Sequence, residues 1–419
     1  MTETLFRSNN SSELHLHVIS MHTSPLAQPG QGDAGGMNVY IDRSIRALLA
    51  DFPQLSVEVF TLASSPTSRK CEQVSERAFV HFIEFEEAFG ANKSDLPYFV
   101  DAFAREVARC ARRKPDIIHA HYWLSGLAAL AYSAGAPVVQ TMHTTAAAKD
   151  ARAESGEPAE PGVRYAGEER IVRECAALIV NTEFERDQMI KLYGADPQKI
   201  CIIEPGVDTG VFRPLPTEPA LHAGSGHSAQ VVFAGRPQAL KGPQILVEAL
   251  ALLPSNLSVE LLLIGRSETD FEKNLLVRAA ELGVSEQIEL LPPASSRELA
   301  RFFRRADIVA CPSSSETFGL VALEAQACGT AVLATRADGL IAAVEDQKSG
   351  ILVPTRDAQT WARAIELLVR SPQLRAQMGE YAHRRASKKT WTRTAHRLMH
   401  LYLLHSTSAL PSQSDSLSC

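Results

Sequence analysis

The sequence predicts an α/β protein made of two doubly wound, Rossmann-like parallel sheets that face each other across a central cleft. Short apolar runs alternate with helical segments in two successive series, which is the pattern of parallel sheets. A Pro-, Gly- and Ser-rich stretch, residues 206–229, separates the two series. The chain has 419 residues, a length that suits about two domains, each with its own core.

The first series of elements predicts an N-terminal domain over residues 1–207. Apolar runs of strand length occur at 14–20, 57–63, 116–121, 137–143, 177–182 and 200–206. Between them, apolar residues at helical spacing predict helices over 38–52, 98–113 and 168–175. The alternation of strand and helix indicates that these strands run parallel.

The second series predicts a C-terminal domain over residues 208–389. Its expected strands are 230–235, 259–265, 288–293, 307–313, 331–336 and 350–354. A final helix, about 390–405, follows this domain and is expected to pack back on the N-terminal one. The polar tail 406–419 is predicted to be disordered.

Composition and charge restrict the function classes. Lys and Arg number 42 against 48 Asp and Glu, a net charge of -6, so general attraction to nucleic acid or an anionic membrane is not expected. The seven cysteines contain no C-x-x-C pair, which favours a reducing compartment. The polar N-terminus and the lack of any run near roughly 18 apolar residues predict a cytoplasmic protein without an integral membrane segment.

A glycine-rich loop, "HTSPLAQPGQGDAGGMNVY" (22–40), separates the first predicted strand from the first predicted helix. Gly35 and Gly36 have no Cβ, so a ligand can approach their backbone. The start of the following helix offers free amides and a positive dipole to a phosphate. The loop is neither a G-x-G-x-x-G fingerprint nor a P-loop, and a plain surface turn is the alternative.

Two further motifs belong to the second domain. "AGRPQALKG" (234–242) places Arg236 and Lys241 after a strand, where two cations can neutralise a diphosphate. Taken alone, this motif slightly favours two solvated surface charges. "SETFGLVALEAQACG" (315–329) sets Glu316 before a helix and Glu324 within its apolar stripe. Because an unpaired buried acid is costly, carboxylates that accept sugar or ribose hydroxyls are favoured over a capping acid with a partnered core acid.

The histidines near strand ends predict no metal centre. His119, His121 and His143 show no H-E-x-x-H or similar zinc spacing, and no G-x-S-x-G elbow indicates a serine hydrolase. Strand histidines are more often core residues than catalytic ones.

Taken together, these motifs resemble the retaining glycosyltransferases of GT-B architecture, family four. The general resemblance rests on Arg236, Lys241 and the Glu316-x7-Glu324 pair. The resemblance extends over about residues 14–404, and a narrower group within the family is indicated by the stretches "HAHYWLSG", "HTTAAAKDA", "GADPQKI" and "PGVDTGVFRP". The resemblance implies transfer of N-acetylglucosamine from UDP-N-acetylglucosamine to 1D-myo-inositol 3-phosphate with retention at the anomeric carbon. That reaction is the first step of actinobacterial mycothiol biosynthesis.

The resemblance also assigns roles to individual residues. Expected contacts to the acceptor come from His22, Asp33, Ala34, Gly35, Gly36, Met37 and Asn38, and its phosphate is expected at Lys93, Tyr122, Thr144 and Arg164. Expected contacts to the donor come from Gln28, Pro29, Gly36, Arg236, Lys241, Ala294, Glu316 (sugar hydroxyls) and Glu324 (ribose). Arg236, Lys241, Glu316 and His143 are the expected catalytic residues.

Some positions depart from the family pattern. Ala294 stands where relatives often have Arg, so selection of uracil at this position would rest on backbone atoms. Segment 64–92 differs from the family pattern at the edge of the acceptor pocket. No cofactor is expected for catalysis. The resemblance implies a non-catalytic Mg²⁺ held mainly by backbone atoms of Phe303, Arg304, Ala306 and Thr330, and a homodimer is expected.

Three alternatives stay open from sequence. The first is the same fold with another acceptor, as in sucrose-phosphate synthases or phosphatidylinositol mannosyltransferases. The second is a UDP-N-acetylglucosamine 2-epimerase, which needs no acceptor site. The third is a nucleotide-sugar binding protein without activity.

Overall fold

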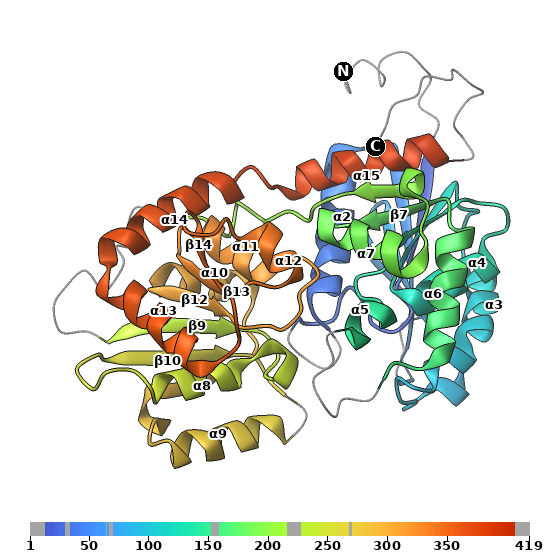
Figure 1. Ribbon diagram of the computed structural model, residues 1–419. Coiled ribbons are helices and arrows are strands. Elements are labelled where there is room, and N and C mark those ends of the chain that lie inside the picture. Colours follow the sequence, from blue (N-terminus) through green and yellow to red (C-terminus); the bar gives the residue numbers. More distant parts are fainter. Residues whose placement is uncertain are drawn as a thin grey trace.

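The computed structural model describes residues 13–29, 34–63, 65–66, 70–151, 159–215, 228–267 and 270–406. They form two α/β domains joined side by side (Figure 1). The predicted acceptor residue Asp33 and the tail residues 407–419 lie outside the described ranges. The two-sheet α/β architecture expected from the sequence is confirmed.

The N-terminal sheet has eight strands among the described residues, in the order β3-β4-β2-β1-β5-β6-β7-β8. The strands are β1 (Leu14–Ile19), β2 (Leu55–Leu62), β3 (Cys71–Ser75), β4 (Ala78–Ile83), β5 (Ile117–His121), β6 (Val138–Thr141), β7 (Ala177–Val180) and β8 (Ile200–Ile202). All pairs are parallel except β3 with β4. These two strands were not assigned from the sequence, and they form the sheet's edge in the divergent segment 64–92.

Helices cover both faces of this sheet. They are α2 (Gly36–Asp51), α3 (Val100–Cys110), α4 (Trp123–Tyr132), α5 (Ala146–Asp150), α6 (Gly162–Glu174) and α7 (Glu183–Tyr193), with short 3-10 turns η1 (Glu86–Ala88), η2 (Leu96–Phe99) and η3 (Pro197–Lys199). One core layer unites the sheet with α3, α4, α6 and α7. On the other face, α2 packs beside the last helix of the chain.

The C-terminal sheet has six parallel strands in the order β11-β10-β9-β12-β13-β14. They are β9 (Ala229–Ala234), β10 (Val259–Ile264), β11 (Ile288–Leu291), β12 (Ile308–Cys311), β13 (Val332–Thr335) and β14 (Gly350–Val353). The strand order reverses at β9 here and at β1 in the first sheet. Ligands of open parallel sheets bind at such switch points, outside the carboxyl ends of the strands.

Helices also cover both faces of the second sheet. They are α8 (Pro243–Leu250), α9 (Phe271–Glu281), α10 (Ser296–Arg305), α11 (Leu320–Ala327), α12 (Asp338–Ala343), α13 (Ala358–Arg370) and α14 (Pro372–Ala386), with turns η4 (Ala239–Lys241) and η5 (Ser285–Gln287). The core on one face includes α8, α9 and α13, and that on the other includes α10, α11 and α12.

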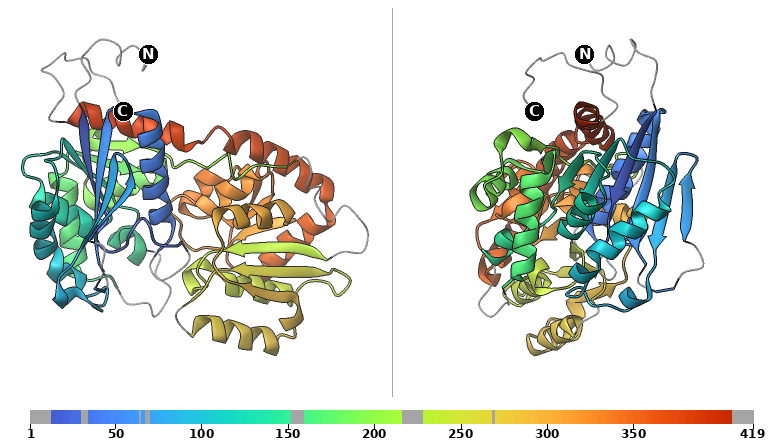
Figure 2. Two further views of the ribbon diagram at one scale, coloured as in Figure 1. Left: turned by 180° about the vertical axis from the view of Figure 1, so that it is seen from behind. Right: turned by 90° about the vertical axis from the view of Figure 1, so that its right-hand side faces the viewer.

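Two chain segments cross between the domains next to each other. The Val207 amide donates to the Lys389 carbonyl at 2.8 Å, and a side chain at Gly206 would clash with the Trp391 backbone. Beyond this crossing, α15 (Trp391–His405) runs back over the N-terminal domain and buries Tyr402 there (Figures 1 and 2). No described helix combines the length and apolar character needed to cross a membrane.

Candidate active site

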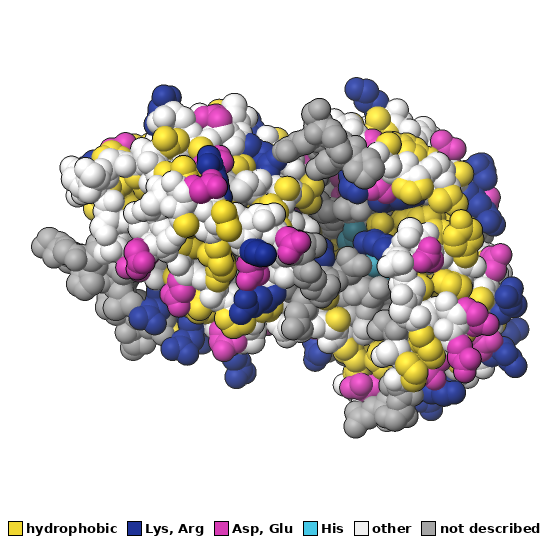
Figure 3. All heavy atoms as spheres, turned by 90° about the horizontal axis from the view of Figure 1, so that it is seen from below, with side chains coloured by type: hydrophobic (Ala, Val, Ile, Leu, Met, Phe, Trp, Pro, Cys, Tyr) yellow, Lys and Arg dark blue, Asp and Glu magenta, His cyan; other side chains and the backbone are white. Residues whose placement is uncertain are grey.

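A large cleft of ≈ 1480 Å³ lies between the two domains. The space-filling view from below shows a hollow between the halves, with histidine and basic side chains inside (Figure 3). The carboxyl ends of β1, β5, β6, β9, β10 and β12 meet there. The predicted substrate and catalytic residues that line it are His22, Gln28, Pro29, Ala34, Gly35, Gly36, Met37, Asn38, Lys93, Tyr122, His143, Thr144, Arg164, Arg236, Lys241, Ala294, Glu316 and Glu324.

The C-terminal wall joins a cation to a carboxylate. Lys241, at the end of η4, places its Nζ 2.6 Å from Oε1 of Glu316. The Ser313 hydroxyl, on the loop after β12, donates to the same oxygen at 2.9 Å. Arg236 follows β9 and lines the same wall. The two cations predicted for a diphosphate and the acid predicted for sugar hydroxyls therefore share one surface.

Glu324 lies in the middle of α11 and faces the cleft. Burial raises the pKa of its carboxyl to about 8, although Arg43 favours the charged form and Asp208 opposes it. The acid is therefore mostly protonated at neutral pH in the free protein. A protonated carboxyl both donates and accepts hydrogen bonds, so this group can change its role when a ligand arrives.

On the N-terminal wall, cations gather around the ring of Tyr122. The Lys93 ammonium lies 5.6 Å from the ring centroid and the Arg164 guanidinium 5.1 Å. The His22 ring packs against the same tyrosine with centroids 4.5 Å apart. Tyr122 caps the start of α4, immediately after β5. Two cations, a phenol and an imidazole converge here from separate parts of the chain.

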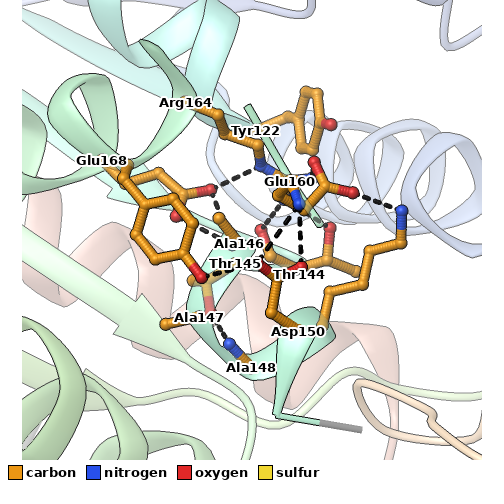
Figure 4. A network of polar contacts seen from close by, with 12 residues as sticks. Tyr122, Thr144, Thr145, Ala146, Ala147, Ala148, Asp150, Glu160, Arg164 and Glu168 are labelled. Carbon is orange, nitrogen blue, oxygen red and sulfur yellow. Dashed lines mark hydrogen bonds and ion pairs between the residues drawn. The ribbon is translucent and has the colours of Figure 1, made fainter. Parts of the chain in front are cut away.

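Arg164 is held by a dense polar network (Figure 4). Its Nε donates to Glu168 and its Nη1 to Glu160, each at 2.8 Å. Its Nη2 donates to the carbonyl and hydroxyl oxygens of Thr144 at 3.0 and 3.2 Å. Burial raises the pKa of Glu168, although Arg164 pulls it down. Arg164 itself lies in the first turn of α6.

The glycine-rich loop ends in a tight cap at the start of α2. The Asn38 side-chain oxygen accepts from the Gly35 amide at 2.9 Å, and its nitrogen donates to Thr23 and Ser24 at 2.9 and 2.6 Å. Nothing lies within 4 Å of a Cβ built on Gly35, and one built on Gly36 would face Leu320 of the other domain at 3.7 Å. Asn38 thus shapes the loop from beneath, and the glycine backbone faces the cleft.

His143 follows β6 in a left-handed backbone conformation, with φ of 61°. Its Nε2 lies 3.0 Å from Nδ1 of His121, behind the cleft wall. Burial lowers the pKa of His143 to about 3, so the ring is neutral across the physiological range. It can donate or accept one hydrogen bond but cannot act as a cation.

Backbone strain gathers at the cleft. Five described non-glycine residues have positive φ, and Tyr122, His143 and Asp338 among them line the cleft. Such conformations cost of order 1–3 kcal/mol each and cluster at functional sites. Asp and His adopt this conformation more readily than most residues, whereas Tyr122 gave no signal in the sequence.

Contacts between the two domains were also missed from the sequence. Arg43, on α2, donates to Asp208 at 3.1 Å and to Ser296 at 3.2 Å. The Thr317 hydroxyl donates to the His143 carbonyl across the cleft. No local pattern distinguishes these residues, because their partners lie far away in the sequence.

The residues predicted for Mg²⁺ do not line the cleft. Phe303, Arg304 and Ala306 lie at the end of α10, and Thr330 follows α11. Phe303 is buried in the core, and its carbonyl accepts from the Thr330 hydroxyl at 2.5 Å and from the Ala306 amide at 3.3 Å. The four residues offer backbone and hydroxyl oxygens but no carboxylate, whereas protein Mg²⁺ sites usually include one or two, and the ion stays a prediction.

Comparisons with known proteins agree with this geometry. The family model for glycosyltransferase family 4 matches residues 34–211, and that for glycosyl transferases group 1 matches residues 222–385. A D-inositol 3-phosphate glycosyltransferase of Pseudarthrobacter chlorophenolicus is 43% identical over 389 residues, which cover 90% of this chain and 92% of the relative. One from Mycobacteroides abscessus is 43% identical, with 92% and 88% covered.

Solved structures share the same fold. Sucrose-phosphate synthase from Thermosynechococcus elongatus superposes with a TM-score of 0.83 at 26% identity, covering 93% of this chain and 98% of that one. HepE of Anabaena, solved with UDP and glucose, gives a TM-score of 0.71 at 18% identity, with 93% and 99% covered. The GT-B architecture is thereby confirmed.

Proposed function

The chain belongs to the family of the D-inositol 3-phosphate glycosyltransferases, and from this premise we propose that it transfers N-acetylglucosamine from UDP-N-acetylglucosamine to 1D-myo-inositol 3-phosphate. The observation that carries the acceptor is the cationic cluster of Lys93 and Arg164 around Tyr122, on the wall opposite Lys241 and Arg236. A phosphorylated acceptor and a diphosphate donor would each meet two cations on opposite walls of one cleft.

The proposed reaction breaks the bond between the anomeric carbon and the β-phosphate oxygen. The acceptor hydroxyl attacks from the same face, its oxygen bonds to the anomeric carbon, and its proton passes to the departing phosphate. Negative charge builds on UDP as it leaves, and Arg236 and Lys241 stabilise it.

Donor binding would break the ion pair between Glu316 and Lys241, and each side chain would then contact a different part of the donor. In the free protein Lys241 is paired with Glu316 at 2.6 Å. A diphosphate competes for the lysine, which frees the carboxylate to accept sugar hydroxyls. His143, neutral and fixed by His121, would lie against the sugar as a hydrogen-bonding partner rather than as an acid.

The acceptor wall is less basic than its two cations suggest. Arg164 already contacts two acids, Glu160 and Glu168, so Lys93, which is exposed, would contribute most of the attraction for a phosphate. Thr144 and Tyr122 would add neutral hydrogen bonds. Binding of a small dianion, rather than a lipid, fits this confined arrangement.

The function is tested by measuring UDP release with a panel of nucleotide sugars and acceptors. We expect release only when both UDP-N-acetylglucosamine and 1D-myo-inositol 3-phosphate are present, which would exclude a 2-epimerase. The panel includes a hexose phosphate, because the likeness to sucrose-phosphate synthase makes that class of acceptor the second candidate. Preference for a hexose phosphate would overturn the proposed acceptor while leaving the glycosyltransferase assignment intact.

Acceptor recognition is tested with Lys93→Ala, since Arg164→Ala would leave Glu168 buried without its partner. We expect an increased KM for inositol phosphate with little change in the KM for the donor. Lys191→Ala is the control, because this lysine is exposed on α7 and is not among the residues that line the cleft. Equal effects of both variants would contradict the proposed phosphate contact.

The homodimer and the cytoplasmic location remain proposals. Light scattering on the purified chain tests the first, and cell fractionation the second. Activity that persists in excess chelator would support catalysis without a metal.

A further inference from the structure

Four titratable side chains form a buried cluster in the N-terminal sheet, apart from the residues that line the cleft. His15 and His17 belong to β1, Glu58 to β2 and His81 to β4, with exposed fractions of 3%, 0%, 1% and 5%. Alternate residues of a strand share a face, and β4, β2 and β1 are neighbours. The four side chains therefore meet beneath α4, where the neighbouring positions are apolar.

Three imidazoles converge on one carboxylate in this cluster. The Nε2 of His15 lies 2.8 Å from Oε1 of Glu58, and that of His81 lies 2.7 Å from Oε2. The Nε2 of His17 lies 3.8 Å from Oε1 and, within the described part of the chain, makes no hydrogen bond although it is fully buried. A buried nitrogen aimed at a carboxylate without bonding to it calls for a further ligand.

The outer nitrogens of two rings are fixed by hydroxyl groups. The Nδ1 of His15 lies 2.6 Å from the Ser56 hydroxyl, and the Nδ1 of His17 lies 3.0 Å from the Tyr132 hydroxyl. Histidines that bind metals are typically held in this way, with one nitrogen hydrogen-bonded and the other on the ion. The Tyr132 ring also stacks on His17, which restricts its rotation.

We propose that His15, His17 and Glu58 bind a divalent transition-metal ion, for which zinc is the best match, while His81 holds the other oxygen of Glu58. The ligand atoms of the first three residues lie within 4.8 Å of one another. Ligand atoms of a tetrahedral zinc site lie about 3.4 Å apart, and the distances of 2.8 and 3.8 Å to Glu58 fall on either side of that value. Small rotations of the side chains would admit the ion.

Metal binding needs a neutral imidazole and a charged carboxylate. Besides the histidines, the Arg112 and Arg113 amides donate to the Glu58 carboxylate at 3.0 and 3.3 Å, and such donors stabilise a negative charge. An ion would neutralise this carboxylate inside the sheet.

Access to the cluster is provided by a second cavity of ≈ 740 Å³, which His15 and Glu58 line. Basic side chains also border it but are committed elsewhere. Arg77 donates to backbone carbonyls, and Arg113 pairs with Glu13 at 2.7 Å. The ion would join β1, β2 and β4 and so act structurally, by raising the stability of the sheet.

The test uses the full chain with Cys71, Cys110 and Cys419 replaced by serine, which removes the exposed described thiols and the terminal one. After chelation and buffer exchange, calorimetry with Zn²⁺ measures binding, and the visible absorption of Co²⁺ reports tetrahedral geometry. We expect one ion per chain, an increase of the melting temperature, and affinity reduced at least about tenfold in His17→Gln. His400→Gln, at an exposed helical position, is the matched control and should bind normally.

Two results would overturn the proposal. One is less than half an ion bound per chain by the parent protein, and the other is equal affinity of His17→Gln and His400→Gln. Circular dichroism and transferase activity establish that each variant is folded. Should His17→Gln fail to fold, Glu58→Gln or His81→Gln replaces it with the same expected loss, and the Co²⁺ spectrum of the parent still decides the geometry.

Discussion

Lys241 and Glu316 neutralise each other in the free protein, at 2.6 Å and with about a quarter of each side chain exposed (27% and 23%). A partly exposed ion pair contributes little to the free energy of unfolding. Its function is therefore to be sought in the ligand that displaces Glu316 from Lys241. A diphosphate brings more negative charge than one carboxylate and would take the lysine over. The pair thus keeps a cation oriented in the cleft until the donor arrives.

Removal of this cation should slow the chemical step. We expect Lys241→Ala to reduce kcat by about 10²–10³-fold, the usual effect of losing one group that stabilises developing negative charge. Steady-state UDP release measures it. Lys348→Ala is the control, since this lysine pairs with Glu345 on the surface and should retain full activity. A similar reduction of kcat in both variants would contradict a role of Lys241 in the chemical step.

Glu324 should make the protein less stable as pH rises. Burial raises its pKa to about 8 in the folded state, whereas an exposed glutamate titrates near 4.3. Below about pH 4 both states are protonated and there is no penalty. Between about pH 4 and 8 the unfolded state loses its proton first, so the free energy of unfolding falls with pH.

Urea unfolding at a series of pH values measures this effect as the difference between the wild type and Glu324→Gln. The wild type should lose stability relative to the variant up to about pH 8 and then level off. A constant difference across the range would show that Glu324 is not buried as a neutral acid.

Donor affinity should show the opposite dependence on pH. If Glu324 accepts two ribose hydroxyls it must be ionised, and at pH 7 only about a tenth of it is, for a pKa of about 8. Binding of UDP-N-acetylglucosamine should therefore strengthen about tenfold from pH 7 to 9. Titration calorimetry measures it, and Glu324→Gln should bind weakly with no such dependence. A flat profile in the wild type would refute the ribose contact.

Helix α4 carries Tyr122 at its start and depends on a glycine at its inner face. A Cβ at Gly126 would lie 2.6 Å from Cδ1 of Ile171 and would also meet the Gln140 amide. Both neighbours are buried, so they cannot move aside freely. The close approach of α4 to α6 brings Tyr122 within reach of Arg164, and therefore positions the acceptor wall.

We expect Gly126→Ala to destabilise the protein by about 1–3 kcal/mol through overpacking, as measured by urea unfolding. Gly162→Ala is a matched control in the first turn of α6, where a Cβ meets nothing within 4 Å. It should be neutral or stabilising by up to about 1 kcal/mol. Equal stability of the two variants would mean that the helices separate without cost.

Elements were predictable where local pattern and burial agree. Apolar runs gave all six described strands of the second domain and six of the eight in the first. Strand β3 escaped because it is mostly exposed and lies at an edge, where no apolar pattern is needed, whereas β4 is apolar and largely buried and was missed. The alternation Leu-His-Leu-His in β1 suggests a solvent face, but α4 covers it and both histidines are buried.

At the scale of the whole molecule, the two domains touch around the cleft through a few polar contacts. Arg43 connects α2 with Asp208 and with Ser296 at the start of α10, and Thr317 reaches the His143 carbonyl. Gly206 lets the two crossing segments approach closely. Such sparse polar contacts between domains permit opening and closing.

Loss of one bridge should favour the open form. We expect Arg43→Ala to enlarge the radius of gyration in solution scattering and to weaken donor binding about two- to fivefold, the scale of a partly exposed ion pair. Arg46→Ala, one turn further along α2, is the control because its ion pair with Asp42 stays within the helix. Identical scattering of wild type and both variants would indicate that Arg43 does not hold the domains together.

By itself, the sequence determined the two parallel sheets and the family, and it identified a set of residues that line the cleft. Strand periodicity and glycine, arginine and acidic motifs are local, and a motif after a strand of a parallel sheet lies at the ligand-binding edge wherever that strand is placed. It could not determine that Lys241 pairs with Glu316 or that Arg43 joins the domains.

Those features, and the meeting of His15, His17 and His81 at Glu58, were decided by tertiary structure alone. The contacts of Lys241, Arg43 and Glu58 depend on strand order, register or domain placement, which bring together side chains dozens to hundreds of residues apart. Burial and hydrogen bonds then set the charge, since hydrogen bonds keep Glu58 ionised despite its burial and Glu324 is mostly protonated. Residue type fixes which chemistry is available, and the surroundings formed on folding fix which of it is used.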